Sequence, residues 1–108
     1  MRLGNPAHLK EPDMLHRAFP DYDPATLPAI PANWRDTSWH NDMCPSFAYG
    51  CVQVFIDYAD PEMRESASGY RYGVGYWHED DFVHVAETDD WEVVLAVVRG
   101  YTALTVEA

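Results

Sequence analysis

The chain has 108 residues, the length of a single domain. Its hydrophobic content of 47% and aromatic content of 14% exclude a disordered acidic polypeptide. Eighteen Asp and Glu residues against seven Lys and Arg residues give a formal net charge of −11, which disfavours binding to nucleic acid or to anionic membranes. A basic protein surface is a favourable partner, because opposite charge accelerates the encounter. We therefore expect one folded domain over residues 1–108 and a cationic protein partner.

The sequence carries no sign of a targeting or membrane segment. No apolar run approaches the ~20 residues of a membrane span, and the first 13 residues contain no continuous apolar stretch of the kind found in secretory signals. Two cysteines do not make a disulfide framework. Cys44 and Cys51 are separated by a short loop that would allow pairing, but reduced thiols are the more ordinary state. These features predict a cytoplasmic protein of bacterial or viral origin.

The first part of the chain is rich in proline. Seven of the eight prolines lie in residues 1–45, and proline excludes long regular elements while it favours the first position of a helix. We predict an irregular arm over residues 1–46, with a short helix over residues 12–19. The segment "DPATL" predicts a single turn with Asp23 as its cap and Pro24 as its first residue. The arm is expected to be anchored on a sheet by Phe19, Leu27, Ile30, Trp34 and Trp39.

From residue 47 onward the hydrophobic pattern has a period of two. "GCVQVFIDY" over residues 50–58 alternates as a central strand does. "YRYGVGYW" over residues 70–77 alternates again, and Gly73 and Gly75 indicate a bulge or the close approach of another segment. After the turn "HEDD", the segment "FVHVA" over residues 82–86 predicts a third strand. The three strands are expected to be antiparallel.

The segment "ETDDWEVVLAVVRG" predicts a helix. Thr88 is the expected N-cap, and Gly100 suits the C′ position after the last turn. The apolar face has the spacing i, i+3, i+4 and i+7, in Trp91, Val94, Leu95 and Val98. The following "YTALTV" alternates and suggests a fourth strand. The predicted fold is α+β: a small antiparallel sheet of three to four strands with one C-terminal amphipathic helix packed on it, a β-β-β-α-(β) core over residues 47–108.

The segment "SWHNDMCPSF" gathers reactive side chains in His40, Asp42 and Cys44. Imidazole, carboxylate and thiolate are all zinc ligands, but the spacing is not that of a structural zinc site, and His78 or His84 would have to supply a fourth ligand. A small metal-binding or cysteine-dependent enzyme centred on these three residues is therefore an alternative.

No catalytic motif supports this alternative, and Cys44 would need a base and oxyanion donors nearby. The favoured interpretation is structural. Asn41 and Asp42 form an Asx turn, Trp39 and Phe47 anchor the arm, and Cys44 is a small buried apolar residue. We expect no enzyme activity, no metal and no cofactor.

Negative charge is concentrated in residues 57–92. This segment holds eleven acidic residues and two basic ones, Arg64 and Arg71, which leaves −9 over 36 residues. A merely solvated acidic surface is the simpler explanation, and acidic residues favour helix starts for local reasons. The magnitude argues against it, because like charges destabilise the compact state and solubility needs a net charge of only about 2–8.

A charge of −9 matches about 15 Å of duplex DNA. We therefore expect a small acidic non-enzymatic protein that inhibits a basic, nucleic-acid-binding protein or complex by presenting a negative surface like that of DNA. Anti-CRISPR, anti-restriction and nuclease-immunity proteins share this physical character, although no family motif is present. A homo-oligomeric structural domain, paired through "YTALTV" or the Tyr-rich strand, is a further alternative.

The predicted partner-binding residues are the clustered acids and two aromatic anchors. They are Asp60, Glu62, Glu65, Glu79, Asp80, Asp81, Glu87, Asp89, Asp90 and Glu92, with Tyr76 and Trp77. Tyr70 is a further candidate anchor. The chain is expected to be a monomer or a homodimer.

Overall fold

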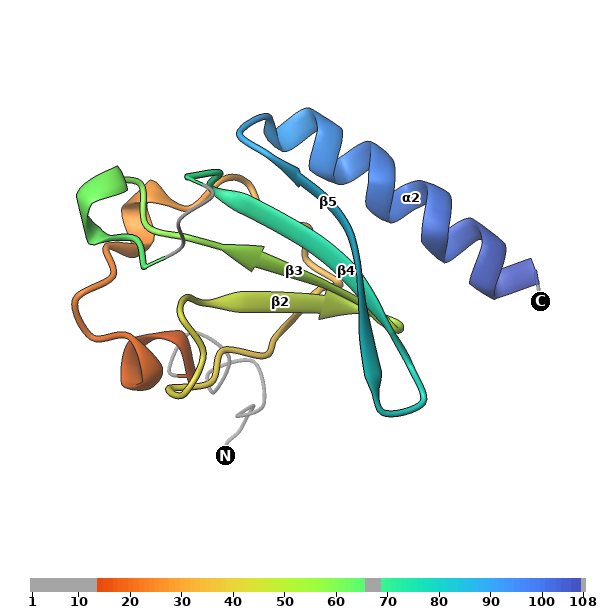
Figure 1. Ribbon diagram of the computed structural model, residues 1–108, viewed down its shortest axis with the longest axis horizontal. Helices are drawn as coiled ribbons and strands as arrows, with labels where there is room; N and C mark the ends of the chain where they lie inside the picture. The colour runs from red at the N-terminus through yellow and green to blue at the C-terminus, as the bar shows by residue number, and fades with distance from the viewer. Residues whose placement is uncertain (1–13, 66–68, 108) are drawn as a thin grey trace.

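The computed structural model describes residues 14–65 and 69–107. Five antiparallel strands form one sheet in the order β1-β2-β3-β4-β5, so each strand pairs with its neighbour in sequence. Helix α2 packs on β3, β4 and β5 (Figure 1). The elements are η1 (Pro24–Thr26), β1 (Arg35–Asp36), β2 (Ser46–Tyr49), β3 (Val52–Ile56), η2 (Pro61–Met63), β4 (Tyr72–His78), β5 (Asp81–Thr88) and α2 (Trp91–Glu107). The α+β class is confirmed, with five strands instead of three to four.

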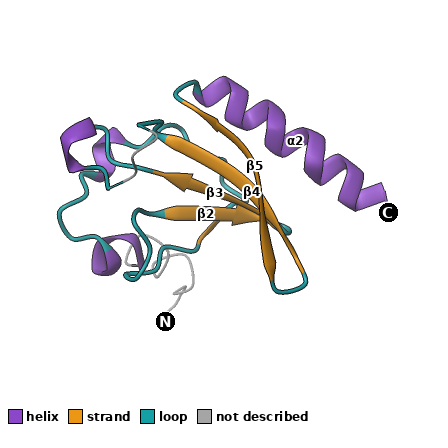
Figure 2. Ribbon diagram, in the orientation of Figure 1, coloured by secondary structure: helices purple, strands orange, loops and turns teal. Residues whose placement is uncertain are grey.

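Of the two additional strands, β1 lies in the segment predicted to be an irregular arm, whereas β2 begins at the last residue of that segment and continues beyond it. β2 begins directly after Pro45 and pairs with β3, with Phe47 opposite Val54. The turn between them contains Gly50 at φ +62°, a conformation that suits glycine. β1 has only two residues and pairs with β2. A strand of two residues shows no alternation, so its formation depends on the neighbouring strand and not on its own pattern. Figure 2 shows β2, β3, β4 and β5 coloured as strands beside the helix α2.

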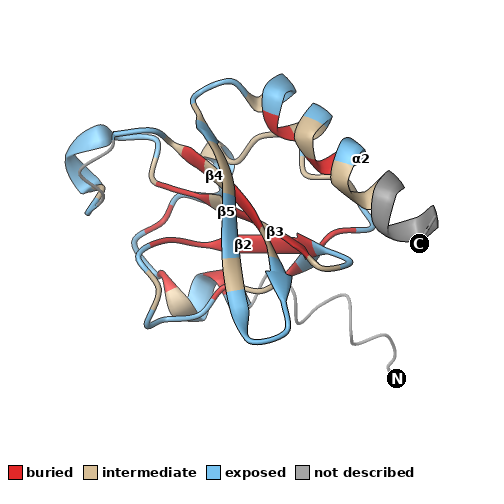
Figure 3. Cartoon of the chain, turned by 45° about the vertical axis from the view of Figure 1, so that its right-hand side comes forward, coloured by how far each residue is buried: buried red, intermediate tan, exposed pale blue. Residues whose placement is uncertain are grey.

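The hydrophobic core lies between the sheet and α2. Val54 and Val74 of the sheet and Val94 and Val98 of the helix belong to one core cluster, and all four are buried. Figure 3 shows buried stretches on β3, β4 and α2. The arm adds further buried side chains to this core, namely Leu15, Phe19, Tyr22 and Trp34, with Leu27 and Ile30 partly buried against it. Trp39 is 54% exposed, so the prediction that it anchors the arm was wrong.

The short helical turns of the arm agree with the sequence prediction. Residues 14–18 are helical and the Phe19 N–H donates to Leu15 O at 2.8 Å, while residues 12 and 13 lie outside the described ranges. η1 is capped by Asp23, whose Oδ1 accepts the Ala25 N–H at 3.0 Å. The arm is joined to the sheet by the Tyr22 hydroxyl, which donates to Asp57 O at 3.1 Å.

Helix α2 starts later and ends later than predicted. Asp90 is its cap, with Oδ1 accepting the Glu92 N–H at 3.0 Å, whereas Thr88 Oγ1 accepts the Asp90 N–H just before the helix. The helix continues through Gly100 to Glu107. Gly100 is therefore not at C′, and the predicted fourth strand over residues 101–106 is helical. Alternation over six residues was too short a pattern to exclude a helix.

The β4–β5 hairpin explains the two glycines of the Tyr-rich segment. The register shifts between Val74 and Gly75, which is the predicted bulge. A Cβ atom at Gly75 would lie 2.5 Å from Val83 O and would strike the Phe82 ring, so the predicted close approach is present as well. Because β4 pairs with β3 and β5, neither of its edges is available for strand pairing between two copies of the chain.

Val94 and Val98 of α2 are buried in the core, with Trp91, Leu95 and Tyr101 packed partly buried against it, whereas Val93 is exposed. Across the residues that the structure describes, no helix combines the length and the apolar character that a membrane crossing requires.

Candidate functional site

The predicted acidic residues divide into two groups at opposite ends of the β4–β5 hairpin. His78 pairs with Asp81 at one end and Tyr72 with Thr88 at the other (Figure 1). These ends are six residues apart along β4, about 20 Å at ~3.3 Å per residue. The tip group consists of Glu79, Asp80 and Asp81. The base group lies on the β3–β4 connection, the end of β5 and the start of α2, and consists of Asp60, Glu62, Glu65, Glu87, Asp89, Asp90 and Glu92.

The two arginines of this region bind main-chain oxygens. The Arg64 guanidinium donates to the carbonyls of Tyr58 at 2.6 Å, Gly69 at 2.7 Å and Ala59 at 3.1 Å. Arg71 donates to the carbonyls of Asp57 and Thr26. These guanidinium groups therefore hold loops together and do not form ion pairs with the tip or base group within the described residues.

Three members of the base group also have local structural roles. Asp60 caps η2 by accepting the Glu62 N–H at 3.0 Å, and Asp90 caps α2. Asp89 Oδ1 accepts the main-chain N–H of Arg71 at 2.8 Å, which ties the end of β5 to the start of β4. Local hydrogen bonding to the main chain therefore explains these three carboxylates without a partner. Glu62, Glu65 and Glu92, in contrast, are exposed and cap no helix.

The predicted aromatic anchors differ in exposure. Trp77 is 46% exposed and its Nε1–H donates to Gln53 Oε1 at 2.7 Å, which fixes the indole on the sheet face away from α2. Tyr70 is 48% exposed. Tyr76 is half-buried and its ring stacks on Tyr101 of α2 with the centroids 5.5 Å apart. Tyr76 therefore belongs to the helix–sheet interface and not to an exposed surface.

His40, Asp42 and Cys44 do not converge on one point. The exposed His40 ring packs 4.5 Å from that of Trp39. The turn is closed by the main chain, with the Asp42 N–H donating to Trp39 O at 2.9 Å. Within residues 14–65 and 69–107, no three His, Cys, Asp or Glu side chains are placed to hold a metal ion.

Cys44 is buried, in agreement with its predicted structural role, and neither it nor Cys51 is in a disulfide. Burial raises the pKa of the Cys44 thiol, and the carboxylates of Asp57 and Asp42 raise it further. The thiolate, which is the form that acts as nucleophile or metal ligand, is therefore disfavoured.

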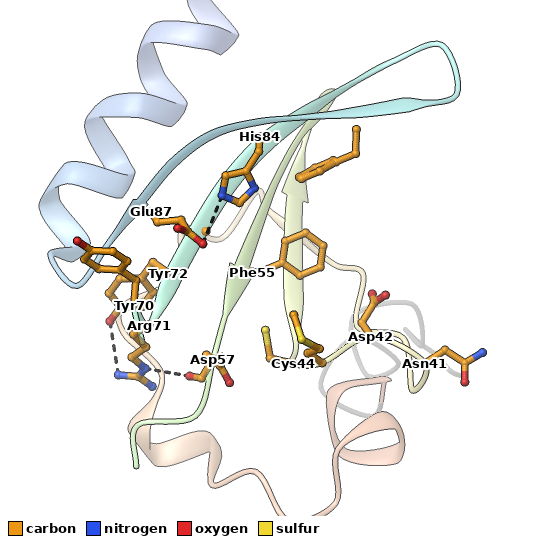
Figure 4. Close-up of a pocket in the computed structure, with 13 residues that line it drawn as sticks. Asn41, Asp42, Cys44, Phe55, Asp57, Tyr70, Arg71, Tyr72, His84 and Glu87 are labelled. Atoms are coloured by element: carbon orange, nitrogen blue, oxygen red, sulfur yellow. Dashed lines mark hydrogen bonds and ion pairs between the residues drawn. The ribbon is translucent and has the colours of Figure 1, made fainter. Parts of the chain in front are cut away.

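A pocket of about 350 Å³ lies on the face of the sheet opposite α2 (Figure 4). Gly73 borders it and lies in the register of the sheet between Phe55 of β3 and Glu87 of β5. The His84 ring lies beside this glycine, 3.4 Å from the position of a Cβ atom at Gly73. The loop at residues 41–44 closes one side. This pocket was not predicted from the sequence, although a glycine within an alternating strand was a usable signal.

Two carboxyl groups of this pocket are perturbed by burial. Burial raises the pKa of Asp42. Burial also raises the pKa of Asp57, against the opposing effects of the Tyr58 N–H, which donates to Asp57 Oδ1 at 2.8 Å, and of Arg64 and Arg71. Perturbed ionisable groups beside a cavity are typical of binding sites.

No protein-family model, no curated protein and no solved structure matches the chain. Function is therefore inferred from the two acidic groups and the pocket.

Proposed function

We propose that this chain is a small acidic, non-enzymatic binding protein that engages a basic, nucleic-acid-binding protein or complex and competes with nucleic acid for its surface. The observation that supports this most is that the arginines of the acidic segment do not neutralise its carboxylates. Residues 57–92 carry −9, and both arginines in that segment donate to main-chain carbonyls. The exposed carboxylates of the tip group, and those of Glu62, Glu65 and Glu92 in the base group, thus stay available to an external cation.

The spacing of the two groups also supports the proposal. A stretch of duplex about 20 Å long carries about 12 phosphate charges. The tip and base groups together hold seven carboxylates at the two ends of a hairpin of that length and three more on the β3–β4 connection. The hairpin is fixed in the middle by its pairing with β3, so the two groups keep their separation. A basic surface that holds a nucleic-acid backbone is the matching partner.

Inhibitors of CRISPR complexes, of restriction enzymes or of nuclease toxins are the finer classes within this proposal. The raised pKa of the Cys44 thiol, caused chiefly by burial, favours a binding protein over a cysteine-dependent enzyme. Pairing between copies through β4 is opposed by the neighbours on both of its edges, which disfavours a dimer paired through the Tyr-rich strand.

The proposal is tested by capture and competition. The immobilised chain is exposed to a lysate of bacteria that carry nucleic-acid-based defence systems, and retained proteins are eluted at ~50 and ~200 mM salt. We expect basic nucleic-acid-binding proteins whose apparent affinity falls at least about tenfold over this range, and which duplex DNA displaces. Retention that is indifferent to salt, or that duplex DNA does not compete with, contradicts the proposal.

Two matched variants separate a specific surface from net charge alone. One replaces Glu79, Asp80 and Asp81 with lysine, and the other replaces Glu62, Glu65 and Glu92, which are exposed. Each changes three side chains and raises the net charge by six. We expect at least a tenfold loss of retention from at least one variant, with the helical and strand content unchanged by circular dichroism. Full retention by both variants would rule out binding through these groups.

A further inference from the structure

We propose that the pocket at Gly73 receives an arginine side chain of the cationic partner. This inference rests on the proposed function, because it names the contact by which such a partner is anchored. The pocket is separate from the tip group and lies on the face of the sheet opposite α2. The proposed ligand group is a guanidinium.

The size and the walls of the pocket suit one side chain. Its volume of about 350 Å³ lies at the lower end of the ~300–1,000 Å³ range of ligand pockets. Phe55 and Phe82 meet edge to face, with their ring centroids 5.7 Å apart and the planes at 87°. Both rings are half-buried and border the pocket, as Gly73 does. They offer an apolar, aromatic surface to an incoming group.

The charged lining selects a cation. Asp42, Asp57 and Glu87 all border the pocket, and Figure 4 shows Asp42 and Glu87 on opposite sides of Phe55. Arg71 also borders it, but its guanidinium donates to the Asp57 carbonyl at 3.0 Å, the Thr26 carbonyl at 2.9 Å and the Tyr22 hydroxyl at 3.2 Å, on the side of the arm. The pocket is therefore lined by three carboxyl groups and by one arginine, whose guanidinium group already donates to other acceptors.

An anion is excluded by this lining, and a neutral ligand would leave the carboxylates poorly compensated. Asp57 is only 5% exposed, and burial raises its pKa and that of Asp42. A bound cation offsets the cost of their partial removal from water.

Among cations, the guanidinium group fits best. It is planar, stacks on aromatic rings, pairs with two carboxylate oxygens at once and is less strongly hydrated than an ammonium group. The pocket offers aromatic rings and carboxylates together. His84 Nε2 lies 3.6 Å from Glu87 Oε2 as a competing neighbour, but both side chains are well exposed, at 52% and 39%, and such a pair is weak. An arginine can therefore displace the imidazole from Glu87.

The test uses a minimal probe, the capped amino acid N-acetyl-arginine methylamide, in an NMR titration of the isotopically labelled full chain. The matched probe is the capped citrulline, which has the same shape without the charge, and capped lysine is a third arm. We expect saturable shifts of the Gly73, Phe82 and His84 amides with arginine, with a Kd on the order of 1 mM. Lysine should bind more weakly, and citrulline at least about tenfold more weakly.

Variants locate the contact. Asp42→Asn and Glu87→Gln should each weaken arginine binding by about threefold or more. Asp21→Asn is the matched control, because it removes one charge outside the pocket while its amide oxygen can still accept the Tyr58 hydroxyl. Phe55→Leu, which keeps an apolar side chain at that position, should also weaken binding, through loss of the aromatic contact.

The outcomes separate this inference from the proposed function. Equal shifts with citrulline, or shifts confined to residues 60–65 and 79–81, overturn the pocket assignment even if salt-sensitive capture of a basic partner is intact. Pocket shifts that pass these controls, together with a failure of salt-sensitive capture, leave a guanidinium site and overturn the proposed function.

Discussion

Asp42 closes a turn through its main chain, but its ionised carboxyl group lowers the stability of the folded chain. Its N–H closes the turn to Trp39 O at 2.9 Å, while its carboxyl group borders the pocket, where burial raises its pKa. The folded state therefore holds the proton more tightly than the unfolded state does. For such a group the stabilising contribution is present below the unfolded pKa of about 3.9 and is lost as the pH rises through the folded pKa. At neutral pH the ionised Asp42 destabilises the fold.

Asp42→Asn should consequently raise the stability of the chain at pH 7, and this gain should disappear near pH 3. Urea denaturation at the two pH values measures both free energies of unfolding. Asp21→Asn controls for the loss of one negative charge, and its gain at pH 7 should be smaller. A gain that persists unchanged at acidic pH would show that the asparagine side chain itself, and not the ionised carboxylate, is responsible. A stabilised variant that no longer binds capped arginine would show that Asp42 is kept for binding.

At the scale of elements, long patterns were predictable and short ones were not. β3 and β4 were found because Val52, Val54 and Ile56, and then Tyr72 and Val74, alternate over a full strand. β1 and β2 were missed because they are short. β2 forms by pairing with β3, and β1 by pairing with β2. The N-cap of η1, Asp23, was predictable from local chemistry.

The candidate site was less predictable than the fold. The sequence shows that acids cluster between residues 57 and 92, but the register of β4 and β5 decides that they form two groups. The pocket depends on cross-strand neighbours of Gly73 that no local pattern reveals. In the same way, Tyr76 looked available from alternation alone, whereas the extension of α2 to Tyr101 covers it.

Gly100 provides a test of the revised helix boundary. Inside a helix, glycine costs roughly 0.5–1 kcal/mol relative to alanine, and a Cβ atom at Gly100 meets nothing within 4 Å. Gly100→Ala should therefore increase the free energy of unfolding by about that amount. A matched substitution, Gly50→Ala, should decrease it, because Gly50 has φ +62°. Destabilisation by Gly100→Ala would restore the predicted C′ position and end α2 near residue 99.

The stability of the whole molecule is affected by its excess negative charge. Arg64 and Arg71 stabilise loops through carbonyls, so the formal charge of −11 acts against the compact state. Such repulsion is a cost without benefit for a domain that only needs to stay dissolved. It is understandable for a domain that binds a cationic partner, because the partner removes the repulsion on binding.

Salt should therefore act in opposite directions on folding and on binding. The Debye length falls from ~30 Å at 0.01 M salt to ~8 Å at 0.15 M, and the tip and base groups are about 20 Å apart, so their mutual repulsion is felt only at low salt. We expect the thermal midpoint to rise between these two concentrations of sodium chloride, measured by circular dichroism. The variant Glu79→Gln, Asp80→Asn, Asp81→Asn should show a smaller rise, because it lacks the tip charges. An equal rise in both proteins would mean that the tip group does not interact with the base group. In that case the charge selected for binding would reside at one end of the hairpin only, and partner contact should be lost on reversal of that end alone.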